Sequence, residues 1–266
     1  GSEIAGPGIA GALIKVLGAP FAIAFDALLI AASVMLLRGV RSPESTPTRS
    51  GASFGQQLRE GVRFVFRTPM LWMLALFVGC WQLLHHMANV VQILVASREL
   101  GMSAQSIGLC YVGMGVGTIA ASLYGRRVSE RFGPGPTIVA GFAVSSVGWL
   151  SLAAAPVGGL GVLLFTLTLT CFSSGATLIF VNFLALRQAA TPEPLLGRMT
   201  STMRWLILIG AGPGALLGGY IGEHLGLRTV LGLASLGAGA LALVASRNAM
   251  LMGTRRLPTP APVSSY

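Results

Sequence analysis

Charged side chains are scarce in this sequence. They make up 10% of its 266 residues, whereas a soluble domain usually carries about 25%. Hydrophobic residues make up 53%, and there are 36 glycines, a residue that is more frequent in membrane helices than in soluble ones. A soluble fold of this size lacks the interior volume to hide so much apolar surface. The composition therefore excludes an ordinary water-soluble domain and indicates a chain embedded in a lipid bilayer.

Paired cysteines and a coherent basic patch are also missing. The three cysteines, Cys80, Cys110 and Cys171, lie inside apolar runs without a Cys-x-x-Cys spacing, so we expect small buried thiols, no disulfide and no metal site. The net charge is +10, but the basic residues stand at the ends of apolar runs and form no single patch. That distribution excludes nucleic acid as a partner. We expect no cofactor.

Long apolar runs are what the chain has instead. A membrane helix needs about 20 mostly apolar residues. Residues 1–17 have the character of the second half of such a helix. Seven complete spans follow, at about 20–37, 70–96, 105–124, 136–154, 157–184, 199–221 and 226–246. The sequence thus predicts an all-α, polytopic membrane helical bundle of about seven and a half transmembrane helices.

The distribution of arginine predicts the orientation of these spans. If segment 38–69 faces the cytoplasm, all but three of the 18 lysine and arginine residues fall on the cytoplasmic side, the exceptions being Lys15, Arg98 and Arg228. The positive-inside rule describes this bias. We therefore expect a multi-pass protein with a cytoplasmic C-terminus.

The segment 39–69 predicts a cytoplasmic linker that ends in an amphipathic helix. Its apolar residues Phe54, Leu58, Val62, Val65 and Phe66 share one face. Such a helix either lies on the inner membrane surface or packs on the floor of the bundle, and the sequence leaves both open. The tail 251–266 is rich in proline, serine and threonine and is expected to be disordered.

Two segments of the chain repeat each other. Ala-Gly-Pro-Gly begins at Ala5 and again at Ala211, and each copy leads through a short turn into an apolar helix. The spacing leaves room for six helices, the repeat expected of a transporter built from two parallel halves. Residues 1–38 would then end an N-terminal half, residues 70–250 would form a C-terminal six-helix bundle, and the missing N-terminal helices of the same transporter would be a partner. The glycines allow close helix approach and the prolines kink their helices, for gating or for plain packing: Gly6, Pro7, Gly8, Gly11, Gly212, Pro213, Gly214 and Gly218.

These segments carry a resemblance to the major facilitator superfamily. Residues 5–11 and 211–219 look like its antiporter-type Gly-Pro motif, and residues 125–133 look like its basic cytoplasmic loop without the acid commonly found early in that loop. Residues 187–198 are similar to the loop before the eleventh helix in a drug and siderophore efflux branch, which includes macrolide and enterobactin exporters. The resemblance implies helices 5b to 12 of an N-terminally truncated transporter in a bacterial inner membrane. Its loop-motif residues are Gly125, Arg126, Arg127, Glu130, Arg131 and Arg198.

One predicted span carries an unusual set of polar residues. Gln82, His85, Asn89 and Gln92 step by three, four and three, which places them along one helix face. In the family that this chain resembles, the first helix of each half lines the central cavity. We therefore predict that this polar stripe contacts a small-molecule substrate, with interhelical hydrogen bonding as the alternative. Trp81 and His86 beside the stripe, and Asn182 in another span, complete the predicted substrate cavity.

Few groups are suited to proton coupling or to catalysis. Glu3 and Asp26 are the candidate carboxylates, although Asp26 has the alternatives of capping its helix or pairing with Lys15. His85 is a further proton-binding candidate, but adjacent histidines point about 100° apart and cannot easily share one metal ion. No hydrolase or protease motif occurs. We predict proton-coupled efflux of a small amphipathic compound and no enzyme; the alternatives are a non-transporting membrane scaffold that needs a partner and an intramembrane enzyme.

Overall fold

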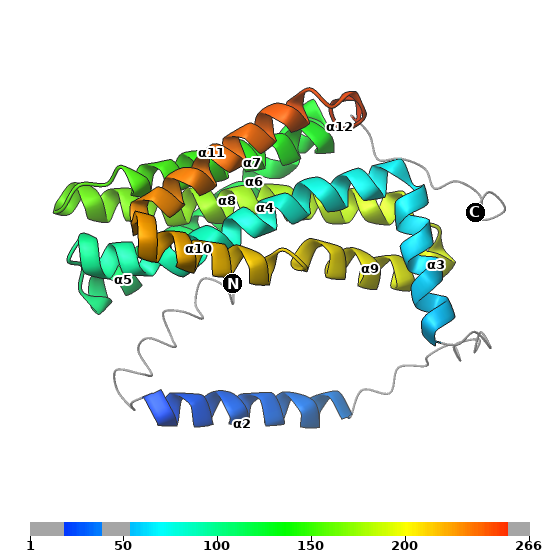
Figure 1. Cartoon of the computed structure of the whole chain (residues 1–266). Coiled ribbons are helices and arrows are strands. Elements are labelled where there is room, and N and C mark those ends of the chain that lie inside the picture. The colour runs from blue at the N-terminus through cyan, green and yellow to red at the C-terminus, as the bar shows by residue number, and fades with distance from the viewer. Residues whose placement is uncertain (1–18, 39–53, 255–266) are drawn as a thin grey trace. The chain divides into compact units, whose positions relative to one another are not determined.

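A computed structural model describes residues 19–38 and 54–254 (Figure 1). The chain divides into two units, residues 1–53 and residues 54–266. In the first unit, helix α2 spans Ala19–Arg38 and matches the expected span 20–37 to within one residue at each end. The predicted linker at 39–53 lies outside the described residues, as do Glu3, Gly6, Pro7, Gly8 and Gly11.

The second unit is built of helices, and the described residues contain no strand. Gly133 and Gly158 have a positive φ, at which other residues would be strained; the first follows the helix that ends at Phe132 and the second precedes the helix that begins at Gly159. The elements are α3 (Phe54–Arg67), α4 (Pro69–Leu94), η1 (Val95–Glu99), α5 (Ala104–Cys110), α6 (Val112–Phe132), α7 (Pro134–Ala153), α8 (Gly159–Ala189), η2 (Glu193–Leu195), α9 (Leu196–Leu208), α10 (Ala211–Leu225), α11 (Leu227–Ser246) and α12 (Ala249–Gly253).

Within the described ranges, six helical stretches of this unit are long and apolar enough to cross a membrane. Large apolar side chains such as Leu109, Leu163, Leu216 and Leu236 stay exposed along them, which suits contact with lipid. Only helices and closed barrels satisfy every backbone polar group in hydrocarbon, so these sequences fold as helices. The stretches are Pro69–Glu99, Ala104–Phe132, Pro134–Ala153, Gly159–Ala189, Glu193–Leu225 and Leu227–Ser246.

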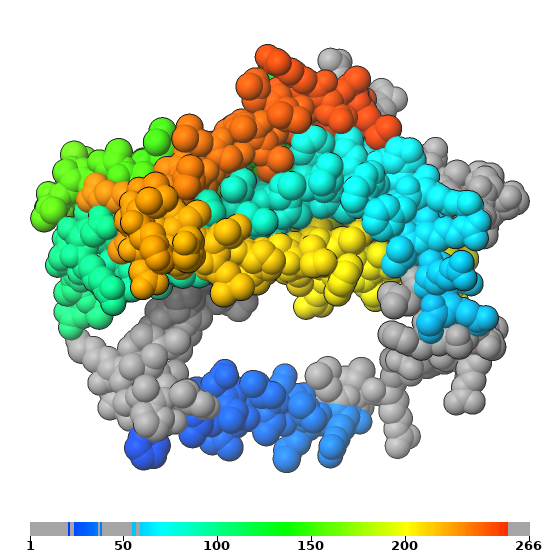
Figure 2. All heavy atoms as spheres, in the orientation of Figure 1, coloured from blue at the N-terminus to red at the C-terminus, as the bar shows by residue number. Residues whose placement is uncertain are grey.

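The six stretches pack in an order that differs from their order in the chain. α6 lies beside α8, α8 beside α7, α7 beside α11, α11 beside α4, and α4 beside α10. Figure 2 shows α4, α10 and α11 side by side across one face of this unit. The stretches containing α6 and α10, at the two ends of this order, are the least buried of the six. The largest fully buried side chains are Trp81, Trp149, Phe142, Phe165 and Phe183.

The structure corrects three expected boundaries. Residues 125–132 continue helix α6 and form no loop, so the basic motif lies on the last turns of a membrane-length helix. α8 likewise extends to Ala189, five residues beyond its expected end at 184. The beginning of the tail is ordered, because α12 (Ala249–Gly253) buries Leu251 against Gly135 at the start of α7.

The helix that carries the second Ala-Gly-Pro-Gly segment is broken. α9 ends at Leu208 and α10 begins at Ala211. Pro213 has no N–H to donate to the carbonyl of Ile209, and its ring crowds that carbonyl. The break therefore falls where the proline removes a helical hydrogen bond. It divides the stretch that lies beside α4.

Candidate functional site

The predicted polar stripe lies on α4. The side chains of Gln82 and Gln92 are buried, those of His85 and His86 are half-buried, and Asn89 is exposed. Two hydrogen bonds within the helix hold the side chains of the stripe in place. Gln92 Nε2 donates to Asn89 Oδ1 at 2.8 Å, and His86 Nδ1 donates to the Gln82 carbonyl at 2.8 Å. Both contacts are internal to α4, so the polar atoms are positioned by their own helix.

His85 belongs to an aromatic cluster formed with α8. Its ring lies parallel to that of Phe172, with centroids 4.4 Å apart and 14° between the planes, and it also stacks on Trp81 at 5.6 Å. Phe180 meets Trp81 edge-on at 5.9 Å. Trp149 of α7 adds a stacked contact to Phe172 at 6.4 Å. One face of α4 thus presents amide, imidazole and aromatic groups together.

Phe172, Phe180 and Trp149 were missed by the sequence argument. Each stands in a long apolar run, where an aromatic residue is normally lipid-facing or core. No spacing in the chain relates α8 to α4, because the two helices are separated by three others. Only their packing reveals that these rings surround His85 and Trp81.

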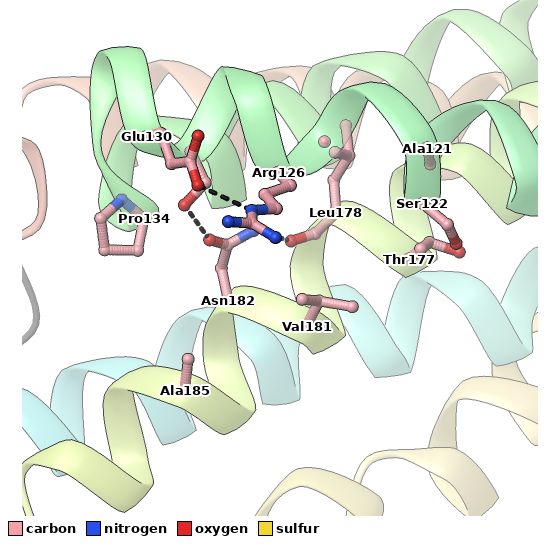
Figure 3. A pocket seen from close by; sticks show the side chains of 12 residues that line it. Ala121, Ser122, Arg126, Glu130, Pro134, Thr177, Leu178, Val181, Asn182 and Ala185 are labelled. Carbon is pink, nitrogen blue, oxygen red and sulfur yellow. Dashed lines mark hydrogen bonds and ion pairs between the residues drawn. The ribbon is translucent and has the colours of Figure 1, made fainter.

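Asn182 lies apart from the stripe. Ser129 Oγ of α6 donates to Asn182 Oδ1 at 2.6 Å, and Asn182 Nδ2 donates to the Leu178 carbonyl at 2.8 Å (Figure 3). Residues two apart on a helix point about 200° apart, so Asn182 faces away from Phe180. The structure places Asn182 with the basic motif of α6 and not with Gln82 or His85.

The basic motif lines a cavity of about 590 Å³ between α6 and α8. Arg126 Nε donates to Glu130 Oε1 at 2.7 Å, which forms an ion pair between residues one helical turn apart. Gly125 brings α6 close to α8, since a Cβ there would lie 2.8 Å from Leu178 Cδ2. Arg127 and Arg131 stand over the rings of Tyr124 and Phe132.

The Gly-Pro segment of α10 packs against the stripe helix. Gly214 lies directly against the Leu83 carbonyl, and Gly218 against the Met87 carbonyl. A side chain at either position would collide with the α4 backbone. Gly212 has no described neighbour within 4 Å of a Cβ position, and Pro213 is exposed. Of the predicted packing residues Gly212, Pro213, Gly214 and Gly218, the two that hold α10 close to α4 are therefore Gly214 and Gly218.

The amphipathic helix α3 packs on α9. Gly61 lies under α9, where a Cβ would stand 2.7 Å from Thr202 Oγ1 and 2.9 Å from the Arg198 carbonyl. Arg198 also forms an ion pair with Glu60. Of the two alternatives for this helix, the structure supports packing on the bundle. Arg198, expected within the loop motif, is instead a partner of α3.

The opposite end of the bundle has its own ionic contact. Arg228 Nε donates to Glu99 Oε2 at 2.6 Å, and Arg228 Nη1 donates to the Ala153 carbonyl at 3.3 Å. This contact joins neighbouring ends of η1, α7 and α11. Asp26, a candidate for proton coupling, is exposed on α2 in the first unit. In the part of the chain that the structure describes, no three His, Cys, Asp or Glu residues are grouped as a metal site.

A bundle of six membrane-length helices, with polar groups along one of them, is the architecture of a polytopic membrane transporter. The family model of the Major Facilitator Superfamily matches residues 83–264. No curated protein sequence matches the chain. The chain belongs to the Major Facilitator Superfamily and is a multi-pass membrane protein with the all-α bundle of that family.

Proposed function

We propose that this transporter exports a small amphipathic compound, a drug or a siderophore, in exchange for protons. The observation that carries the proposal is the composition of the α4 face, where Gln82 and Asn89 share a stripe with His85, itself stacked on Phe172. Polar groups at membrane depth are costly and usually serve a cavity or a partner. Aromatic rings next to them suit a compound that has both apolar and polar parts.

Trp81 strengthens the argument for a polar group on the substrate. Its side chain is fully buried, and its indole Nε1 has no hydrogen-bond acceptor among the described residues. A buried donor without an acceptor costs about 1–3 kcal/mol. A substrate oxygen that reaches Nε1 during transport would recover that cost.

The proposed movement uses the contact between α10 and α4. Gly214 and Gly218 hold α10 against Leu83 and Met87, one residue from Gln82 and His86 respectively. A shift of α10 at its break before Ala211 would therefore open or close the approach to the stripe. The first copy of the segment, at Gly6, Pro7, Gly8 and Gly11, is proposed to do the same in the other half.

The proposed coupling groups are Glu3 and Asp26, with His85 as a further proton carrier. We place the α3 end of the bundle in the cytoplasm of a bacterium and the protein in its inner membrane, because Arg126, Arg127 and Arg198 lie at that end. The proposed cavity is completed by N-terminal helices of the same transporter, packed against the two least buried stretches.

Transport by the full-length protein in proteoliposomes tests the proposal, with ethidium as the amphipathic probe and pyranine reporting proton flux. We expect ethidium movement that requires a pH gradient. Asn89→Ala and His85→Ala should each reduce its rate about tenfold, as loss of a hydrogen bond to a bound substrate does. Cys80→Ala is the matched control, since Cys80 is exposed on the same helix about 200° away from Gln82.

Each result bears on a separate part of the proposal. Normal transport by both Asn89→Ala and His85→Ala would show that the α4 stripe does not contact the substrate. Ethidium movement without proton flux would exclude proton coupling. A full-length protein that moves neither ethidium nor any compound of a drug and siderophore panel would favour the non-transporting scaffold.

A further inference from the structure

Among the described residues, only two side-chain nitrogen or oxygen atoms are fully buried without a hydrogen-bond partner. They are Nε1 of Trp81 on α4 and Nε of Arg187 in the last turn of α8. Buried polar groups in folded proteins are nearly always hydrogen-bonded. Both of these atoms can only donate, so each of them lacks an acceptor.

Arg187 is the more unusual of the two residues. It is 9% exposed, and no other charged residue whose burial the structure describes is buried. Arginine is almost never buried unless it is paired. An arginine that snorkels to water keeps its charged head exposed, whereas here Nε, an atom of the guanidinium group, is fully buried. The surroundings of this guanidinium therefore favour a bound counter-ion.

No carboxylate within residues 54–254 neutralises Arg187. Three of the acids in that range already form ion pairs with other arginines: Glu60, Glu99 and Glu130. Glu193 and Glu223 are exposed, and neither forms an ion pair with Arg187. The opposite charge therefore comes from a bound molecule or from another part of the transporter.

Aromatic rings connect the two unsatisfied donors. Trp81 meets Phe180 edge-on at 5.9 Å between ring centroids, and Phe180 meets Phe183 edge-on at 6.4 Å. The guanidinium carbon of Arg187 lies 5.3 Å from the centroid of the Phe183 ring. Phe180, Phe183 and Arg187 step by three and four residues, so they share one face of α8. Through Phe180, that face meets the helix that carries the polar stripe.

We infer that the exported compound carries an acidic group, which Arg187 binds; this rests on the export function proposed above. A carboxylate suits the guanidinium fork, which donates two parallel hydrogen bonds to such a group. The aromatic or hydrocarbon part of the compound lies on Phe180, which is half-buried and keeps part of its ring free. An acceptor oxygen at its other end reaches Nε1 of Trp81. The substrate is thus an amphipathic organic anion.

The spacing of the two donors selects such a compound over other sources of negative charge. Phe180, which contacts Trp81, lies seven residues before Arg187, or about 10 Å along the helix axis. A free phosphate or acetate ion satisfies one donor and leaves the rings uncovered. A carboxylate from the N-terminal half neutralises Arg187 but leaves Nε1 of Trp81 without an acceptor. A drug-sized acid spans both positions.

Binding of two matched probes to the full-length protein in detergent tests this assignment. One is a methoxycoumarin with a butanoate side chain, and the other is the same dye with a butanamide side chain. Fluorescence anisotropy gives their dissociation constants. We expect the acid to bind about tenfold more tightly, the effect of one hydrogen bond to a charged group. Arg187→Gln should abolish this preference, and Arg187→Lys, which keeps the charge without the fork, should retain part of it.

Two further variants separate the site from general effects of charge and packing. Arg247→Gln removes the same charge from an exposed position at the end of α11 and should leave the preference unchanged. Trp81→Phe keeps a ring and removes the donor, so it should weaken binding of both probes about fivefold without changing their ratio. Thermal unfolding of each variant in detergent shows whether it is folded.

The outcomes for the acidic group and for export are distinct. Equal binding of the two probes by the parent protein would refute the acidic group, as would an undiminished preference in Arg187→Gln or an equal loss of preference in Arg247→Gln. Ethidium transport without selectivity for the acid would leave export standing and overturn only the role of Arg187. Selective binding that depends on Arg187, with no transport of either compound, would retain the acid site and contradict export.

Discussion

The imidazole of His85 lies face to face with the ring of Phe172, at 4.4 Å between centroids and 14° between planes. This stack joins the first helix of the bundle, α4, to its fourth long stretch, α8. Stacked aromatic pairs contribute about 0.5–1.5 kcal/mol beyond the area that they bury. His85 therefore has a packing role that is separable from its polarity.

Two substitutions separate these roles. His85→Phe keeps the stack and removes the polar ring, so we expect stability within about 0.5 kcal/mol of the parent protein and impaired transport. Phe172→Leu removes the stack and should lower the free energy of unfolding by about 0.5–1.5 kcal/mol. Unfolding in mixed micelles gives the stability, and proteoliposome transport gives the activity. Full activity of His85→Phe would show that only packing requires an aromatic residue there.

Gly218 is expected to tolerate no side chain. Gly218→Ala drives a methyl group into the Met87 carbonyl and should destabilise the protein by about 1–3 kcal/mol, because two helix backbones must separate. Gly232→Ala on α11 is the control, since no described atom lies within 4 Å of its Cβ position. The control should be neutral or slightly stabilising, because alanine is the better helix former. Thermal unfolding in detergent compares the two, and equal melting temperatures would refute the close contact.

The attachment of α3 depends on Gly61. Gly61→Ala places a methyl group 2.7 Å from Thr202 Oγ1 and should loosen α3 from α9, with faster proteolysis near Phe54–Arg67 and faster amide exchange in that helix. Gly55→Ala, on the same helix with nothing within 4 Å, should leave both rates unchanged. If the two variants exchange alike, α3 is not held by this contact.

The Glu99–Arg228 pair should contribute modestly. The side chains are 31% and 37% exposed, and pairs open to solvent are worth about 0.2–1 kcal/mol. A double-mutant cycle of Glu99→Gln and Arg228→Gln should return a coupling free energy in that range, declining as salt is raised. A coupling free energy of zero at low salt would show that this ion pair does not help to hold η1, α7 and α11 together.

The helical class and the six membrane-length stretches of the second unit were predictable because both follow from local composition. Runs of about 20 apolar residues have no other stable form in lipid, and each of the six membrane-length stretches covers a run identified in the sequence. Helix ends were less predictable. α6 continues through Arg126, Arg127 and Arg131, because long side chains let a helix pass into the headgroup region without breaking.

The polar stripe on α4 was also predictable from the local sequence, since a period of three and four residues places side chains on one face of any helix. The residues that surround that face could not be predicted in this way. The rings of Phe172 and Phe180 come from a helix nearly a hundred residues further along the chain, and α10, which closes on Leu83 and Met87, comes later still.

The amino-acid sequence by itself determined that this protein is helical, lies in a membrane and carries one polar helix face. Tertiary structure alone decided that Asn182 joins Ser129 and not Gln82, and that α3 packs on α9. The physical reason is the apolar solvent. In lipid, hydrophobicity drives a helix into the bilayer but does not select its neighbours, so close packing and interhelical hydrogen bonds make that choice. Those contacts depend on which backbones can approach each other, as at Gly61 and Gly218.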